Sequence, residues 1–296
     1  MKPKHIHFII NPAAGREEPI LSYINNTFKE TDIKWDISIT KEDGDAKKMA
    51  LECLNKTDIV AIYGGDGSVM EVAQALFQKK KPIAIIPGGT ANVMAKELGI
   101  PIDTKEAIEL LTSENFIIQH MDMGLLNNKP FVIRINLGIL ADMVLEADRE
   151  MKNTYGQLAY GITTLQTVSK ADPQTFKITI DGEEIIESGV ALTITNLGNI
   201  GIEGFSFLPD ISFSDGMFDI ILLNEADILS ILRVAGTTLF QQESSVLKRW
   251  KGKEITIELE KMQKFICDDC VMEADKINIK VVPDALQVIV PGKTES

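Results

Sequence analysis

Three glycine-containing segments stand out because each follows an apolar run and precedes a helical pattern. They are Asn11-Pro12-Ala13-Ala14-Gly15, Gly64-Gly65-Asp66-Gly67-Ser68 and Pro87-Gly88-Gly89-Thr90-Ala91-Asn92. Glycines let a backbone approach a ligand closely, and helix N-termini direct unpaired N–H groups at anions. A single turn of this kind is often needed for geometry alone, but three in one domain indicate a phosphate-binding site.

Asp66 lies among these glycines, where its carboxylate would repel a phosphate. A bridging Mg²⁺ would remove that conflict, and a helix N-cap is the simpler alternative role. The sequence has no Gly-x-x-x-x-Gly-Lys-Ser/Thr motif, and its first turn lacks Gly-x-Gly-x-x-Gly. Neither a P-loop enzyme nor an ordinary dinucleotide-binding fold is therefore expected.

The scaffold must bring these segments to one edge of a sheet. Up to about residue 120, apolar strands alternate with helical patterns: strands at 6–10, 35–40, 59–63 and 83–86, and helices at 19–28, 45–54, 69–77 and 93–98. This alternation predicts an α/β domain, a doubly wound parallel sheet covered on both faces. The carboxyl ends of parallel strands share one edge, so the glycine segments are expected to lie together.

After residue 120 most apolar runs alternate with polar residues. The expected strands are 132–136, 176–180, 191–195, 218–223, 254–259, 277–282 and 286–290, with helices near 155–169 and 226–241. Asp181-Gly182 predicts a tight hairpin turn. We therefore expect an α/β nucleotide-binding domain over residues 1–120, a C-terminal antiparallel β-sandwich domain over 121–296, and a site in the cleft between them.

Composition narrows the class of protein. With 43 acidic and 30 basic residues in 296, the net charge is −13, which argues against a dedicated nucleic-acid binder. No apolar run reaches the ~18 residues that span a bilayer. Three cysteines without an export signal fit a reduced, cytoplasmic protein. Cys267-x-x-Cys270 does not predict a zinc site, since no other cysteine lies nearby and the chain has three histidines.

The three segments together resemble the diacylglycerol kinase catalytic-domain family, which includes bacterial diacylglycerol kinases, related lipid kinases and sphingosine kinases. The similarity continues through Asp122-x-Gly124, Phe131 with Asn136-x-Gly138, the segment 155–160, Ser214-Asp215-Gly216-x-Phe218-Asp219 and Pro283-x-Ala285-Leu286. It covers nearly the whole chain in order. The resemblance implies an NAD kinase/diacylglycerol kinase-like fold. It also implies an ATP- and Mg²⁺-dependent lipid kinase that phosphorylates the hydroxyl of diacylglycerol or a related lipid.

Roles for individual residues follow from the same resemblance. Asp66 and Asp122 would position Mg²⁺, and Asp215 with Met217 would hold a second, structural cation. Asp268, which lies 283 − 268 = 15 residues before Pro283, would be the general base, with Asp269 as the next candidate. The ATP phosphates would contact the three glycine segments at Asn11, Gly15, Gly64, Gly65, Asp66, Gly67, Ser68, Gly89, Thr90 and Asn92.

Two positions depart from the family pattern. Val93 stands where the family usually has Asp, and Asp269-Cys270 replace the Gly and Glu of its Asp-Gly-Glu triplet. One alternative is therefore a catalytically weakened nucleotide- or lipid-binding protein. Another is an NAD kinase-like activity, because that related fold also carries Gly-Gly-Asp-Gly.

A lipid substrate implies transient contact with the inner face of a membrane. The basic run Lys248-Arg249-Trp250-Lys251-Gly252-Lys253 could dock to anionic headgroups, and a solvated loop is the alternative reading. The partners expected are thus a lipid substrate and a membrane surface, with a homodimer also considered. No nucleic acid is expected.

Overall fold

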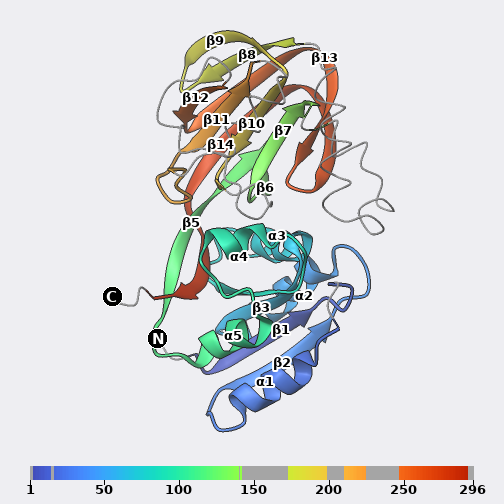
Figure 1. Ribbon diagram of the computed structural model, residues 1–296, viewed down its shortest axis with the longest axis vertical. Coiled ribbons are helices and arrows are strands. Elements are labelled where there is room, and N and C mark those ends of the chain that lie inside the picture. The colour runs from blue at the N-terminus through green and yellow to red at the C-terminus, as the bar shows by residue number, and fades with distance from the viewer. Residues whose placement is uncertain are drawn as a thin grey trace.

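The computed structural model describes residues 3–14, 17–139, 141, 173–198, 210–224 and 247–292, and these form two lobes (Figure 1). The first lobe has a parallel sheet in the order β4-β3-β1-β2. Its strands are β1 (His5–Ile10), β2 (Lys34–Ile39), β3 (Ile59–Gly64) and β4 (Pro82–Pro87). Its helices are α1 (Ile20–Phe28), α2 (Asp45–Cys53), α3 (Asp66–Ala75), α4 (Val93–Glu97) and α5 (Thr104–Glu109), followed by the 3₁₀ turn η1 (Leu110–Thr112).

The first lobe confirms the predicted parallel α/β arrangement. Every residue of β3 and β4 is buried, as expected for continuous apolar strands in the middle of a covered sheet. β2 lies at the edge of the sheet and has exposed residues. The glycine segments follow the carboxyl ends of β1, β3 and β4, so the sheet delivers all three to one edge.

The second lobe is antiparallel. Its strands are β5 (Phe116–Leu126), β6 (Lys129–Phe131), β7 (Arg134–Gly138), β8 (Gln174–Ile180), β9 (Glu183–Gly189), β10 (Ala191–Thr195), β11 (Phe218–Leu223), β12 (Leu247–Gly252), β13 (Glu254–Cys267) and β14 (Cys270–Pro291). A second core lies within it, where the rings of Phe131 and Phe218 stack with centroids 5.4 Å apart. The fold class is therefore the one the sequence predicts.

Local details agree in part with the sequence. Asp181 and Gly182 form the predicted turn between β8 and β9, with φ angles of +50° and +94°. The sequence did not predict α5, β5, β6, β9 or β12, and the two strands expected at 277–282 and 286–290 are one strand, β14. The helices expected near 155–169 and 226–241 lie outside the described residues.

β14 joins the two lobes. It pairs antiparallel with β13 in the second lobe and with β5 along much of its length. Its last part then pairs parallel with β4, where Gln287 lies opposite Pro82 and Val288 opposite Ile83. Val288, Ile289 and Val290 are buried in the first-lobe core. The first lobe is therefore completed by a strand from the far end of the chain.

The contribution of β14 can be tested with two neighbouring residues. Val288→Ala removes buried methyl groups from the first-lobe core and should lower the free energy of unfolding by about 2 kcal/mol. Gln287→Ala, at a half-buried neighbouring position, should change it by less than about 0.5 kcal/mol. Urea denaturation followed by circular dichroism measures both. Equal effects would contradict the role of β14 in this core.

Candidate functional site

The three glycine loops meet at the carboxyl edge of the parallel sheet. Asn11 Nδ2 donates a hydrogen bond to Ser68 Oγ at 2.7 Å, which joins the first loop to the second. The second and third loops touch through backbone, because a Cβ atom at Gly89 would lie 2.6 Å from Gly65 Cα. No side chain could occupy that position, so the glycine there is a packing requirement. The expected convergence of the loops is confirmed.

Asp66 connects the second loop to α4. Its Oδ1 accepts a hydrogen bond of 2.7 Å from the N–H of Val93, the first residue of that helix. Desolvation raises the pKa of Asp66 even though backbone N–H groups, chiefly that of Val93, oppose the rise. Val93 thus takes part through its backbone N–H, which any residue except proline could supply.

The third loop is closed by Asn92. Its side chain accepts a hydrogen bond from the N–H of Gly89 at 3.0 Å and donates one to the Gly89 carbonyl at 2.8 Å. Asn92 has φ of +48°, a left-handed conformation that asparagine tolerates well. Thr90 is exposed at the tip of this loop. Gly15 lies outside the described residues.

Arg134, at the start of β7, brings a positive charge to the site, and sequence reasoning missed it. Burial lowers the pKa of Arg134, and the carboxylates of Asp268, Asp66 and Glu97 oppose that shift. The guanidinium therefore lies among carboxylates from both lobes. Its signal in the sequence is a single arginine in an otherwise apolar strand, Val132-Ile133-Arg134-Ile135. Guanidinium groups are well suited to bind carboxylate or phosphate oxygens.

Asp268 lies in the two-residue turn between β13 and β14. Its Oδ1 accepts hydrogen bonds from the N–H groups of Ile133 (2.7 Å) and Arg134 (3.2 Å), and its Oδ2 accepts one from Val132 (2.8 Å). Desolvation raises the pKa of Asp268 to about 6 against these three donors. The carboxylate therefore clamps the turn to the chain between β6 and β7. Its predicted role as general base stays a prediction.

Asp122 is the centre of a second group of hydrogen bonds at the junction of the lobes, in addition to those of Asp268. Its buried carboxylate accepts hydrogen bonds from the N–H groups of Gly216 (2.7 Å) and Asp284 (3.0 Å). Its own N–H donates to the Phe213 carbonyl, and its carbonyl accepts from Asn196 Nδ2. Burial raises the pKa of Asp122. These bonds give the residue a structural role whether or not it also approaches a cation.

Asp215 is neutralised by a side chain of the protein itself. Its Oδ2 accepts a hydrogen bond from Lys251 Nζ at 2.8 Å, and its Oδ1 accepts one from the Met217 N–H at 3.1 Å. An ammonium group therefore lies against the carboxylate for which a structural cation was predicted. That second cation site stays a prediction.

The donor set near the glycine loops is compatible with Mg²⁺. Among the described residues no group of three or more His, Cys, Asp or Glu side chains is arranged to hold a metal ion. Mg²⁺ at phosphoryl-transfer sites is commonly held by one or two carboxylates together with substrate phosphates and water. Asp66, a half-buried carboxylate whose charged form is penalised by desolvation, fits that requirement.

Cys267 and Cys270 are direct partners across the same hairpin turn. In an uninterrupted strand, residues three positions apart face opposite sides of the sheet. Here the turn makes Cys267 and Cys270 neighbours on the two adjacent strands of the hairpin. Cys267 is buried and Cys270 exposed, and both are free thiols. Burial raises the pKa of each thiol, and the neighbouring carboxylates of Asp268 and Asp269 raise it further. Both thiols are therefore protonated at neutral pH and poorly suited to metal binding.

The basic run at 248–253 forms β12 and the residue after it, rather than a free loop. Lys248 pairs with Glu187 at 2.7 Å, and Lys251 pairs with Asp215. Arg249 contacts Asp210 and Asp219. Three of the basic side chains are thus neutralised by carboxylates of the second lobe. Docking of this run to a membrane stays a prediction.

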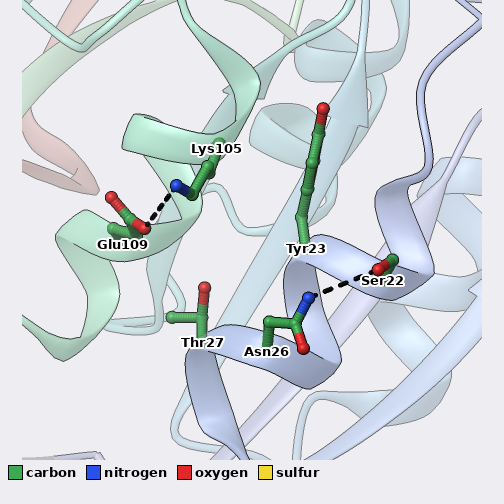
Figure 2. A pocket seen from close by; sticks show the side chains of 6 residues that line it. All are labelled: Ser22, Tyr23, Asn26, Thr27, Lys105 and Glu109. Carbon is green, nitrogen blue, oxygen red and sulfur yellow. Dashed lines mark hydrogen bonds and ion pairs between the residues drawn. The ribbon is translucent and has the colours of Figure 1, made fainter.

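A separate hollow of about 430 Å³ lies between α1 and α5, on the side of the first lobe away from the second (Figures 1 and 2). Two pairs of its lining residues bond to each other: Lys105 with Glu109 (3.5 Å) and Asn26 with Ser22 (3.3 Å). None of the residues predicted from the sequence to act in the site lines this hollow.

Comparison with known proteins agrees with this architecture. The sequence model of the family "diacylglycerol kinase catalytic domain" matches residues 5–126. The sequence model of the family "YegS C-terminal NAD kinase beta sandwich-like domain" matches residues 134–290. The diacylglycerol kinase of Bacillus subtilis strain 168 is 30% identical over 243 residues, which cover 80% of this chain and 79% of the relative. A protein of Synechocystis, sll0036, is 29% identical over 98% of this chain and 71% of its own length.

Solved structures from Bacillus anthracis strain Sterne are similar over 98% of both chains. One has a TM-score of 0.85 at 28% identity, and another, described as a diacylglycerol kinase, has a TM-score of 0.76 at 25% identity. The fold and the glycine loops thus define a phosphotransferase of the lipid kinase class. The chain belongs to the diacylglycerol kinase catalytic-domain family. Within the described ranges, no helix is long and apolar enough to cross a bilayer.

The buried hydrogen bonds of the Asp122 carboxylate predict that its substitution lowers the stability of the protein. Asp122→Asn replaces one acceptor oxygen by an NH₂ group that faces a backbone donor, so unfolding should become easier by about 1–3 kcal/mol. Asp284→Asn, whose side chain is 72% exposed, should have little effect. Differential scanning calorimetry of both variants tests this. An unchanged midpoint for Asp122→Asn would contradict the structural role.

The raised pKa of Asp268 predicts a pH-dependent contribution to stability. The folded pKa of about 6 exceeds the unfolded value near 3.8, so between these limits the folded protein binds the extra proton. The stability of the wild type relative to Asp268→Asn should therefore fall as pH rises from about 4 to about 6, and level off above. Urea denaturation at a series of pH values measures this difference. A stability difference that rises with pH would contradict a raised pKa for Asp268 in the folded protein.

Proposed function

We propose that the protein transfers the γ-phosphate of ATP to the hydroxyl group of diacylglycerol or a related lipid, with Mg²⁺ as the required cation. The observation that carries the proposal is the meeting of three glycine loops around the carboxylate of Asp66, opposite a turn from the second lobe. The family of the chain supports the phosphate transfer, and the name of the Bacillus subtilis relative supports the acceptor.

The glycine loops are suited to hold the phosphates of ATP. A Cβ atom at Gly64 would collide with Ser68, one at Gly88 with Tyr63, and one at Gly89 with the Gly65 backbone, so glycine is required for the loops to pack this closely. Asn11 and Ser68, already bonded to each other, present amide and hydroxyl groups at the same edge. Positioning and charge neutralisation account for most of the rate of phosphoryl transfer.

Asp66 would hold the magnesium ion together with phosphate oxygens and water. When bound, the ion neutralises charge on the β- and γ-phosphates. Arg134 adds a fixed positive charge from the second lobe, close enough to interact with Asp66 and Asp268. A carboxylate of the β13–β14 turn accepts the proton of the lipid hydroxyl as the hydroxyl oxygen attacks phosphorus.

One observation favours a second candidate, a nucleotide-binding protein with weak or no turnover. Position 93 carries a valine side chain where the family usually has the carboxylate of an aspartate, so one expected acidic group is absent from the first lobe. Such a protein would bind ATP and leave lipids unphosphorylated.

The proposed reaction predicts a large effect of Asp66→Asn. Removing the charge that holds Mg²⁺ should lower lipid phosphorylation by at least about 100-fold, because electrostatic stabilisation dominates this kind of transfer. Transfer of label from γ-³²P-ATP to diacylglycerol in mixed micelles, with Mg²⁺, measures it. Asp32→Asn removes an exposed carboxylate just before β2, at the opposite edge of the sheet, and should leave the rate unchanged.

Labelled lipid formed at equal rates by Asp66→Asn and the wild type would contradict the role of Asp66. If the wild type binds ATP in calorimetry and labels no lipid, the nucleotide-binding alternative replaces the proposed function.

A further inference from the structure

The β13–β14 turn carries residues of the second lobe to the glycine loops. Cys267 and Cys270 are paired on either side of it, and Asp268 and Asp269 form its tip. β13 is held against β7 through Ile266 and Cys267, and the Asp268 N–H continues this ladder by donating to the Arg134 carbonyl at 2.8 Å. The tip therefore has a fixed position at the junction of the lobes.

The two carboxylates at this tip have different surroundings. Both oxygens of Asp268 accept backbone N–H groups, three bonds in all, from residues 132–134. A carboxylate held in this way is a clamp, and moving it toward a substrate would leave three buried donors without partners. Asp268 therefore fixes the turn.

Asp269 faces the opposite way, toward the glycine loop of the first lobe. Its Oδ2 would lie 3.0 Å from a Cβ atom at Gly67, the second residue of α3. Its Oδ1 lies 3.5 Å from the thiol of Cys270, whose pKa is raised by burial, by Asp269 and, to a smaller extent, by Glu71 of α3. The residue is exposed, so substrate and solvent can reach it.

We propose that Asp269 is the general base of the lipid kinase reaction and that Asp268 positions it. This inference rests on the proposed function and names the residue that the reaction requires on the acceptor side. Gly67 follows Asp66 directly, so Asp269 lies beside the loop that would hold the transferred phosphate. A lipid hydroxyl between Asp269 and that phosphate would contact both.

The chemical step balances with these groups. The hydroxyl of the lipid gives its proton to a carboxylate oxygen of Asp269 as its oxygen forms the new bond to the γ-phosphorus. The bond from the γ-phosphorus to the β,γ-bridging oxygen breaks, and its electron pair remains on ADP. Asp269 then releases the proton to solvent, which reaches the exposed turn.

Asp269→Asn tests the proposal because it keeps the size of the side chain and removes the base. The kcat for phosphorylation of diacylglycerol should fall by about 10²- to 10⁴-fold. The KM for MgATP and the thermal midpoint should not change, since the side chain of Asp269 makes no bond that clamps the turn. Glu273→Gln, an exposed carboxyl further along the same hairpin, should keep the wild-type kcat.

Asp268→Asn provides the contrasting variant. It should lower the thermal midpoint, and below that midpoint it should retain more turnover than Asp269→Asn. An active wild type with a fully active Asp269→Asn variant would overturn the assignment of the base alone. A wild type that phosphorylates neither diacylglycerol nor a mixed lipid extract would overturn the proposed function and this assignment with it.

Discussion

The close contact of the Gly65 and Gly89 backbones is the constraint on which the candidate site depends. β3 and β4 are adjacent parallel strands, so their following loops start side by side, and the Gly88 N–H donates to the Gly64 carbonyl. The loops can then touch only if position 89 carries no side chain. That contact brings Asp66 to the first N–H group of α4. The close approach of the loops and the half-buried position of Asp66 thus arise together from strand order and glycine.

The second lobe contributes to the same place through β14. This strand pairs with β13 at one end and with β4 at the other, so it is anchored in both lobes, and the turn that precedes it is held by the pairing with β13. Burial at the junction of the lobes desolvates several carboxylates, including those of Asp66, Asp122 and Asp268, and this desolvation raises their pKa values. The guanidinium of Arg134 offsets part of that charge. A bound cation would offset more, which connects the electrostatics of the junction to the chemistry proposed for it.

The sequence predicted those features that depend on local pattern. The buried runs of β3 and β4, the Asp181-Gly182 turn and the order of the glycine loops could all be recognised from neighbouring residues. β12 was missed because its basic residues suggest a solvated loop, and their partners, such as Glu187, are distant in sequence. The clamp formed by Asp268 joins residues more than 130 positions apart, so no local pattern contains it. Asp269 and Gly67 are also far apart in the sequence, so their approach could not be predicted from a local pattern.

The departures from the family pattern have a physical meaning once these contacts are known. At position 93 the structure uses a backbone N–H, so the change to valine removes a carboxylate without disturbing the bond to Asp66. At position 269 a carboxylate stands where the family has glycine, and it reaches Gly67. Cys270 replaces the second carboxylate of the family triplet and leaves a protonated thiol beside Asp269. Relative to the family pattern, the chain therefore has one carboxylate fewer, and one of those that remain stands at the tip of the turn, where the proposed reaction would need a base.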